Sequence, residues 1–316
     1  MRETRYYTVA GHGFCVEAEV DDFGVMQNYE AFRTSLDQTT PGPSRSAMPL
    51  GSSKNSGGEK VVFAISIGDG EKPEYTEEFR QEEEGQTIVC GYSTERKEAV
   101  YEFLRPVGSK RPEVERAWAG ETAGWLVAKA DYHSATLVMA GNQQRKFAID
   151  NALMVMFALA TADKDTLLFH AAVVSHEGRG YMFLGPSGTG KSTHARLWLQ
   201  HIEGTELVND DNPVVRGNRV YGSPWSGKTP CYRNVSYPLG GIVLLSQAPY
   251  NKITRLGGLQ AYAALVMSIS GKRWDARIAD GLHEAENKLV SHVPMWHLEC
   301  LPDGAAAELC QVNIKH

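Results

Sequence analysis

The sequence predicts an α/β domain at residues 145–316, preceded by a smaller, mainly β domain at residues 1–144. Two observations carry this prediction. Residues 6–140 contain many short alternating or apolar runs separated by turn residues, a pattern typical of strands. From Thr166 onward, apolar runs of strand length alternate with segments of helical length, a pattern typical of helices packed on a sheet.

The N-terminal part is expected to be a set of strands with one long irregular loop. Residues 41–58 are rich in Pro, Ser and Gly, and they are expected to form a mobile loop. Residues 71–84 are dense in acidic side chains, and we interpret them as a solvated edge rather than a functional site. The clearest strand predictions are residues 14–20, 60–67, 87–90 and 135–140.

The C-terminal part begins with one buried helix at residues 145–162, where we place the domain junction. Residues 167–174 and 180–184 are predicted to be two strands joined by a turn at 175–179. The other predicted elements are, in order, a helix at 193–200, a strand at 206–208, a largely irregular stretch at 212–238, a strand at 241–245, helices at 259–268 and 277–290, a strand at 294–300 and a closing helix at 304–311.

Composition and charge narrow the class of protein. The chain has 316 residues and a formal net charge of −6, which argues against a broad nucleic-acid-binding surface. Its five cysteines lack a C-x-x-C pair, so we expect reduced thiols rather than a disulfide or zinc framework. The N-terminus has no apolar signal core, and the longest apolar run, residues 152–162, is too short to span a bilayer. We therefore expect a cytoplasmic protein with no membrane and no nucleic-acid partner.

The most specific motif is a glycine-rich loop that fits G-x-x-x-x-G-K-[ST]. Its glycines adopt backbone angles closed to other residues, so several N–H groups can turn inward on a phosphate chain. Lysine adds positive charge for the β- and γ-phosphates, and the serine hydroxyl is a ligand for Mg²⁺. A flexible turn with a chance lysine is the alternative, but a strand before the loop and a helix after it favour ATP and Mg²⁺ binding. The predicted nucleotide-binding residues are Gly185, Pro186, Ser187, Gly188, Thr189, Gly190, Lys191, Ser192 and Thr193.

An acidic pair, Asp210 and Asp211, follows the loop in the sequence. Asp210 lies 19 residues after Lys191, which allows one short helix and one strand that returns beside the first. The pair should then reach the phosphate end of the sheet. There Asp210 can hold Mg²⁺ while Asp211 faces an acceptor hydroxyl as general base. The alternative is a turn or helix-cap acid, because Asp-Asp-Asn-Pro is also a typical turn sequence.

Two further features are candidates for the site. His170 lies at the end of a predicted strand, and it is either a packed core histidine or a group that orients a carboxylate or contacts a phosphate. Residues 224–234 place Lys228 and Arg233 in a loop rich in Gly, Pro and aromatic residues. That loop is either a lid over the transferred phosphate or acceptor, or a surface loop with a tryptophan anchor.

The histidine segment at 169–174, the glycine loop at 185–192 and the acid pair at the end of 207–211 follow one another along the chain. Together, in this order, they resemble the catalytic domain of HPr kinase/phosphorylase. That family belongs to a superfamily that includes ATP-dependent phosphoenolpyruvate carboxykinase, and the resemblance covers residues 167–245. It implies an α/β P-loop kinase domain in which Lys191 and Ser192 hold the phosphates and Mg²⁺. It also implies that Asp211 is the base toward a serine hydroxyl, with His170 in the active site and Asp210 near the metal.

The chain departs from that family at several points. Thr193 stands where HPr kinases usually have Glu, and residues 268–290 lack the family's segment for its protein substrate. The N-terminal part also differs, and residues 224–234 are similar to uncharacterised HPr-kinase-like proteins, some of them near peptide-maturation systems. The expected activity is transfer of phosphate from Mg-ATP to a hydroxyl of a protein, peptide or small molecule, with self-association into a homo-oligomer. A nucleotide-gated regulatory protein and a phosphorylase acting in reverse are the alternatives.

Overall fold

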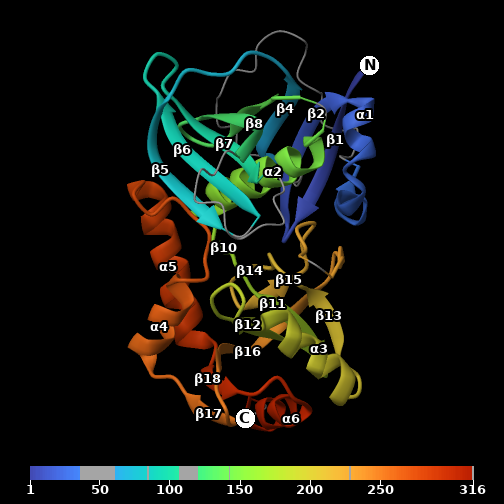
Figure 1. Ribbon diagram of the computed structural model, residues 1–316, viewed down its shortest axis with the longest axis vertical. Coiled ribbons are helices and arrows are strands. Elements are labelled where there is room, and N and C mark those ends of the chain that lie inside the picture. Colours follow the sequence, from blue (N-terminus) through green and yellow to red (C-terminus); the bar gives the residue numbers. More distant parts are fainter. Residues whose placement is uncertain (36–60, 84, 107–119, 142, 228, 315–316) are drawn as a thin grey trace, which may run out of the picture.

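The computed structural model describes residues 1–35, 61–83, 85–106, 120–141, 143–227 and 229–314. These residues form a mixed α/β fold with two large mixed sheets, one above the other in Figure 1. The loop predicted at 41–58 and the candidate cation Lys228 lie outside the described residues.

Within the described residues, the first sheet has nine strands in the order β3-β1-β2-β4-β9-β8-β7-β6-β5. β4 runs parallel to β2 and β9, and the other neighbouring pairs are antiparallel. The four predicted strands are confirmed as β2, β4, β6 and β9. The strands are β1 (Arg2–Val9), β2 (His12–Glu19), β3 (Arg33–Thr34), β4 (Val61–Asp69), β5 (Thr76–Glu83), β6 (Gln86–Ser93), β7 (Glu98–Pro106), β8 (Gly120–Lys129) and β9 (Ser134–Met139).

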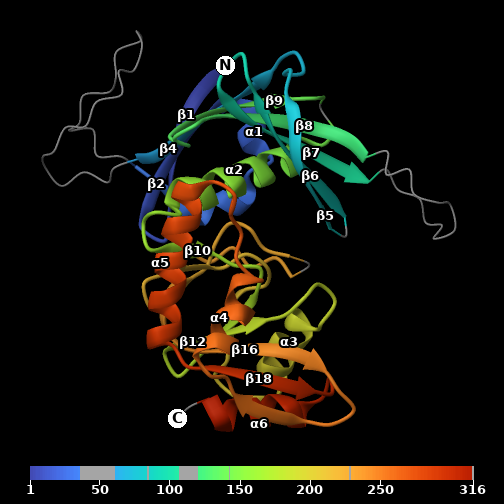
Figure 2. The same cartoon turned by 90° about the vertical axis from the view of Figure 1, so that its left-hand side faces the viewer.

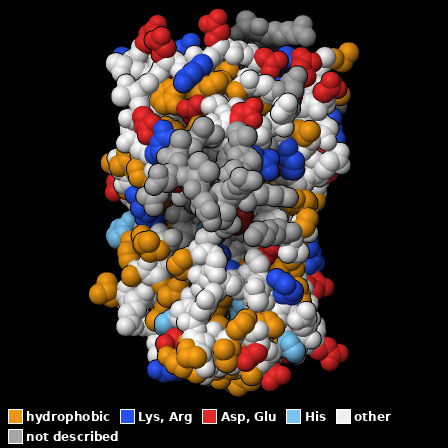
Figure 3. Space-filling view, in the orientation of Figure 1, with side chains coloured by type: hydrophobic (Ala, Val, Ile, Leu, Met, Phe, Trp, Pro, Cys, Tyr) orange, Lys and Arg blue, Asp and Glu red, His pale blue; other side chains and the backbone are white. Residues whose placement is uncertain are grey.

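The acidic segment at 71–84 supplies the edge strand β5 of this sheet. The side chains of residues 76–82 are exposed, as expected for a solvated edge. Charged side chains on an edge strand oppose pairing with another chain. Acidic and basic side chains are interspersed over the upper half of the face in Figure 3.

Helix α2 (Arg145–Thr161) confirms the buried helix predicted at 145–162 and covers one face of the first sheet. A Cβ atom at Gly124 of β8 would lie 2.8 Å from the carbonyl oxygen of Val138 in β9 and 3.4 Å from the Cβ of Ala148, so glycine at this position avoids a clash with the neighbouring strand under α2. The short elements α1 (Val20–Gly24) and η1 (Gln27–Phe32) lie at the start of α2, where Arg145 bonds Asp22. Among the described residues, no helix is both long enough and apolar enough to cross a membrane.

Within the described residues, the second sheet follows the order β10-β14-β15-β16-β12-β11-β13, with β18 paired to β16 and β17 paired to β18. The long strand β16 joins two groups of strands: its first residues pair with β15, and later residues pair with β12 and β18. The strands are β10 (Thr166–Leu168), β11 (Ala172–His176), β12 (Arg179–Leu184), β13 (Glu206–Asn209), β14 (Val214–Arg216), β15 (Arg219–Tyr221), β16 (Ser236–Gln247), β17 (Lys252–Arg255) and β18 (Met295–Cys300).

Helices α3 (Lys191–His201) and α6 (Gly304–Ile314) share one core on the second sheet. Trp198 of α3 is fully buried there against the rings of Tyr181 and Phe183. α4 (Gly258–Val266) and α5 (Ala276–His292) confirm two further predicted helices. α5 runs up the side of the molecule toward α2 (Figure 2), and a Cβ atom at Gly281 would lie 2.5 Å from the carbonyl oxygen of Ala162.

A hydrophobic core distinct from the one under α3 and α6 spans both sheets. It continues from Phe14 of β2 through Phe157 of α2 to Val214 of β14. A hydrogen bond also joins the two parts, because Nη1 of Arg216 in β14 donates to the carbonyl oxygen of Ala10 at 2.9 Å. Residues 145–161, at the start of the predicted C-terminal domain, thus pack on the sheet built from residues 1–144.

The single strand predicted at 167–174 is wrong. These residues form two strands, β10 and β11, which lie far apart in the strand order of the sheet. Between them, the N–H groups of Phe169 and Ala171 donate to the carbonyl oxygens of Pro213 and Asp211. The run is continuously apolar because both strands are buried, so its hydrophobic pattern carries no sign of the break.

Two other expectations about this sheet are corrected. The stretch at 212–238, predicted to be largely irregular, contains β14, β15 and the start of β16. The strand after α3 does not return beside the first: β13 pairs with β11, and β11 lies between it and β12. The antiparallel hairpin of β11 and β12 occupies the place that the simpler prediction assigned to β13.

Candidate active site

Five strand ends meet at one edge of the second sheet. β11 is antiparallel to both β12 and β13, so β12 and β13 end at the edge where β11 begins. β16 and β18 run parallel to β12, and they end at that edge too. Ligands of open α/β sheets bind beyond the carboxyl ends of parallel strands. The segments that follow β12, β13, β16 and β18 and precede β11 are therefore the place to expect a site.

The glycine loop joins β12 to α3, the order that the motif predicts. Gly185, Gly188 and Gly190 have φ angles of 150°, 78° and 111°, in the region that favours glycine. A Cβ atom at Gly185 would lie 3.2 Å from the carbonyl oxygen of Leu245, so the loop also lies tightly against β16. Gly190 precedes the first residue of α3, whose N-terminal amides and dipole favour an anion at this position.

The side chain of Lys191 folds back over the start of the loop. Its Nζ donates to the carbonyl oxygens of Gly185 at 2.8 Å and Pro186 at 3.3 Å, and the residue is 8% exposed. Its charge is therefore held at the glycine loop and partly shielded from solvent, where it can attract phosphate oxygens strongly.

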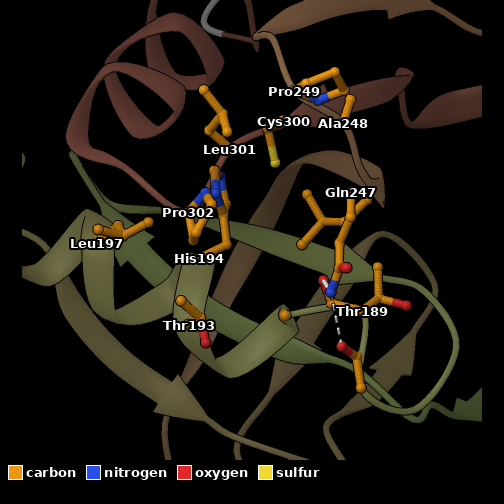
Figure 4. Close-up of a pocket in the computed structure, with 13 residues that line it drawn as sticks. Thr189, Thr193, His194, Leu197, Gln247, Ala248, Pro249, Cys300, Leu301 and Pro302 are labelled. Carbon is orange, nitrogen blue, oxygen red and sulfur yellow. Dashed lines mark hydrogen bonds between the residues drawn. The ribbon is translucent and has the colours of Figure 1, made fainter.

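Gln247, the last residue of β16, holds the tip of the glycine loop. Its Nε2 donates to the carbonyl oxygens of Gly188 at 3.2 Å and Thr189 at 3.5 Å (Figure 4). Thr189 closes the loop from within, because its Oγ1 donates to the carbonyl oxygen of Pro186 at 2.7 Å. Gln247 is a site residue that the sequence did not reveal, since its role depends on β16 lying beside β12.

His170 and Asp211 form a contact pair at the same edge. Nδ1 of His170 lies 3.1 Å from Oδ1 of Asp211, and their side chains are 43% and 32% exposed. The backbone fixes both positions: the N–H of Ala171 donates to the oxygen of Asp211, and the N–H of His170 donates to the oxygen of Ser268, each at 2.8 Å. The pair combines solvent access with a fixed carboxylate, which suits a group that accepts a proton.

Asp210 has a different environment from its neighbour. It is 6% exposed, and its Oδ2 accepts a hydrogen bond from the backbone N–H of Thr229 at 3.0 Å. Gly227 packs beside the pair, since a Cβ atom there would lie 3.2 Å from the Cβ of Asp211. The loop after β15 thus covers the acids, one buried and one accessible.

Asn209 connects this covering loop to the acid pair. It is fully buried, and its Oδ1 accepts from the N–H of Asp211 at 2.9 Å. Its Nδ2 donates to Oγ of Ser223 and to the carbonyl oxygen of Trp225, each at 3.1 Å. The sequence places Asn209 directly before the acids, but nothing in the sequence shows the loop path that gives it this role.

The cation Arg233 of the covering loop does not join the acids. Its Nη1 donates to the carbonyl oxygen of Leu207 at 2.8 Å, and its Nη2 bonds Glu206 at 2.7 Å. The bond with Glu206 raises the pKa of Arg233 above its usual value. The structure therefore places Arg233 along the first half of β13, whereas Asp210 and Asp211 follow the end of that strand. Lys228, the other basic residue predicted for this loop, lies outside the described residues.

A cavity of about 540 Å³ adjoins the glycine loop. It lies toward β16 and β18, whereas His170 and Asp211 lie toward β11 and β13, on the other side of β12. Its volume suits a small organic ligand. Its walls come from the loop, the first turns of α3, the ends of β16 and β18 and the segments that follow them (Figure 4): Gly188, Thr189, Gly190, Thr193, His194, Leu197, Leu245, Gln247, Ala248, Pro249, Cys300, Leu301 and Pro302.

His194 contributes an uncharged wall to this cavity. It is 3% exposed, and its Nε2 accepts from the indole Nε1 of Trp198 at 3.2 Å. Burial lowers the pKa of His194 to about 4, so the imidazole is neutral near pH 7. With apolar residues opposite it, the cavity suits an uncharged planar group better than a second anion.

A magnesium ion at this edge would depend mainly on phosphate oxygens. Among the described residues, no group of three or more His, Cys, Asp or Glu side chains is arranged to hold a metal. Mg²⁺ commonly takes one or two protein oxygens together with substrate phosphates. Ser192 in the first turn of α3 and the carboxylate of Asp210 are the oxygen donors that suit this role.

No protein-family model matches this chain, and no curated protein matches its sequence.

Proposed function

We propose that this chain is a Mg-ATP-dependent phosphotransferase with an HPr-kinase-like P-loop domain, which moves the γ-phosphate to a hydroxyl group. The acceptor is a serine of a protein or peptide, or a small molecule. The observation that carries the proposal is the contact between His170 and Asp211 at the same sheet edge as the glycine loop. A protein that only binds nucleotide needs the loop but not an accessible carboxylate beside it.

The arrangement suggests how a nucleotide would lie. The cavity beside β16 and β18 would take the base and ribose, and the amides of the glycine loop would bind the phosphates. The terminal phosphate would then point toward β11 and β13, where His170 and Asp211 lie. Lys191 would neutralise charge on the β- and γ-phosphates. Ser192 and Asp210 would hold Mg²⁺, which would supply further positive charge against the phosphates.

The chain's own residues supply the remaining chemistry. The acceptor hydroxyl would give its proton to Asp211 while its oxygen forms a bond to the γ-phosphorus. The bond between that phosphorus and the oxygen bridging to the β-phosphate would break, and ADP would leave. His170 would hold the carboxylate of Asp211 in position, and the base would contribute about 10²- to 10⁴-fold in rate. Positioning and charge neutralisation would contribute the rest.

A labelling experiment tests the proposal. The unmutated protein, Asp211→Asn and the control Asp280→Asn are incubated with γ-labelled Mg-ATP and with free serine, serine peptides or a cell extract. Asp280 is exposed on α5, so its substitution repeats the charge change on a different element. Label on an acceptor with the unmutated protein and Asp280→Asn, but not with Asp211→Asn, is the expected result. ATP binding without a labelled product from any pool contradicts the proposal and favours a nucleotide-gated regulator.

A further inference from the structure

The loop that covers the acid pair is anchored in the other half of the molecule. Trp225 is 4% exposed, and its Nε1 donates to the hydroxyl of Tyr29 in η1 at 2.9 Å. Its ring also packs on Phe157 of α2, with the centroids 5.3 Å apart. The tryptophan therefore joins the loop after β15 to η1 and α2, both of which lie against the first sheet.

Asn28 of η1 provides a second anchor for the same loop. This residue is 3% exposed, and its Nδ2 donates to the carbonyl oxygen of Pro224 at 2.9 Å and to Asp150 at 3.1 Å. Its Oδ1 accepts from Nζ of Lys146 at 3.0 Å. Because both ends of the amide are engaged, its orientation toward the loop is fixed.

Hydrogen bonds continue from these anchors to the acids. The carbonyl oxygen of Trp225 accepts from Asn209, which in turn accepts from the N–H of Asp211. Farther along the same loop, Thr229 donates to Asp210. The loop residues 223–227 are thus held from outside at their start and reach the backbone of Asp211 through Asn209, and Thr229 bonds Asp210.

We propose that Asn28 and Tyr29 are positioning residues of the phosphotransfer site. They fix the loop at Pro224 and Trp225 and, through Asn209, the backbone position of Asp211. The inference rests on the proposed function, and it extends the site to the part of the chain that the sequence assigned to a separate domain. A displacement of about 1 Å at a reacting group can lower a rate about 100-fold. Loss of the anchors should therefore lower turnover, whereas the glycine loop and cavity, on the other side of β11, should still bind nucleotide.

The test compares Tyr29→Phe with Tyr101→Phe in the full-length protein. Each change removes the hydroxyl of a buried tyrosine that has a partner, but the Tyr101 hydroxyl lies 3.2 Å from that of Tyr132, within the core of the first sheet. Two quantities are measured: hydrogen exchange of the backbone amides at 209–231, and transfer from γ-labelled Mg-ATP to the acceptor found by the labelling assay.

Tyr29→Phe is expected to speed exchange at Asp211 and Thr229 and to lower kcat about tenfold or more, because a general base depends on its alignment. The dissociation constant for Mg-ATP should stay within about twofold, since the change leaves the loop contacts of Lys191 intact. Tyr101→Phe should leave the exchange and kcat unchanged. Asn28→Ala is the second variant and should act in the same direction as Tyr29→Phe.

Unchanged exchange at Asp211 and Thr229 in both Tyr29→Phe and Asn28→Ala overturns the inference. Faster exchange with an unchanged kcat also overturns it, because the anchors then hold the loop without serving the reaction. If the unmutated protein transfers no phosphate, the proposed function fails. The exchange data still decide whether the anchors hold the acids, so the two failures are distinguishable.

Discussion

Nδ1 of His170 lies 3.1 Å from Oδ1 of Asp211, although the two residues are far apart in the sequence. A backbone hydrogen bond of 2.8 Å from Ala171 to Asp211 holds the start of β11 beside the segment that follows β13. The carboxylate is therefore positioned by both its own backbone and an imidazole. With Oδ1 in contact with the imidazole, the carboxylate keeps a second oxygen able to accept a proton.

Replacement of the imidazole should impair transfer without impairing binding. His170→Gln is expected to lower kcat about 10- to 100-fold, because the carboxylate of Asp211 loses its partner. The affinity for Mg-ATP, measured by calorimetry, should change little. His292→Gln is the control, since His292 is exposed at the end of α5 and bonds a carbonyl oxygen of its own helix. Equal kcat for His170→Gln and the unmutated protein would argue against an active-site role.

Removal of the loop lysine should abolish tight nucleotide binding. Lys191→Ala deletes a charge that contacts the glycine loop, and we expect Mg-ATP affinity to fall about 10- to 100-fold, the range of a charge-assisted hydrogen bond. Lys252→Ala is the matched control, because Lys252 lies in β17 with a side chain that is 65% exposed. Titration with ATP measures both. Unchanged affinity in Lys191→Ala would remove the basis for the nucleotide site.

The amide of Gln247 provides a test that keeps the size of the side chain. Gln247→Glu loses the donor that bonds the carbonyl oxygens of Gly188 and Thr189, and it places a negative charge beside the phosphate loop. We expect ATP affinity to fall about tenfold or more in Gln247→Glu. Gln247→Ala, which adds no charge, should have a smaller effect. The same affinity in all three proteins would show that the tip of the loop needs no support from β16.

Cys300 reports whether the cavity holds the nucleotide base. It is half-buried in the cavity wall, and burial raises the pKa of its thiol, so slow alkylation is best followed at alkaline pH. Mg-ATP should slow alkylation of Cys300, measured by mass spectrometry, whereas tripolyphosphate should not, because it fills only the glycine loop. Cys15 in β2 is the internal reference. Equal protection by the two ligands would place the base elsewhere.

Protonation of His194 should make the free energy of unfolding depend on pH in the acid range. Its pKa is lowered from 6.5 to about 4 by burial, so protonation favours the unfolded chain as the pH falls below 6.5. This group should lower the free energy of unfolding by about 3 kcal/mol between pH 6.5 and 4, with no further loss below that range. Urea unfolding of His194→Gln should show a shallower pH dependence over this interval, and His292→Gln should not. Parallel curves for His194→Gln and the unmutated protein would contradict the prediction.

The local conformation of the glycine loop was predictable from the sequence, and the contacts between distant segments were not. The glycine loop requires special φ angles and a following helix, and both requirements are visible in residues 185–200. The side chains of Asn209 and Gln247 carry no such signal, because each acts on a segment brought to it by strand order. The bond between Arg233 and Glu206 was unpredictable for the same reason, because the fold brings these two distant segments together.

Some strands were predicted wrongly because burial on both faces removes the alternation of polar and apolar residues. The continuous apolar run at 167–174 was predicted to be one strand, although residues 169–171 connect β10 to β11 in a different part of the sheet. The short strands β14 and β15 were missed for the opposite reason: with three residues each, they are too short to show alternation.

The shared core has a consequence for how this chain can be divided. The core passes from Phe14 through Phe157 to Val214, so the two sheets should unfold together rather than in separate transitions. A fragment that begins at residue 145 would expose the face of α2 that the first sheet covers, and Trp225 would lose Tyr29. The smallest segment that could be transplanted into another chain with a working site is therefore larger than the glycine loop and its own sheet.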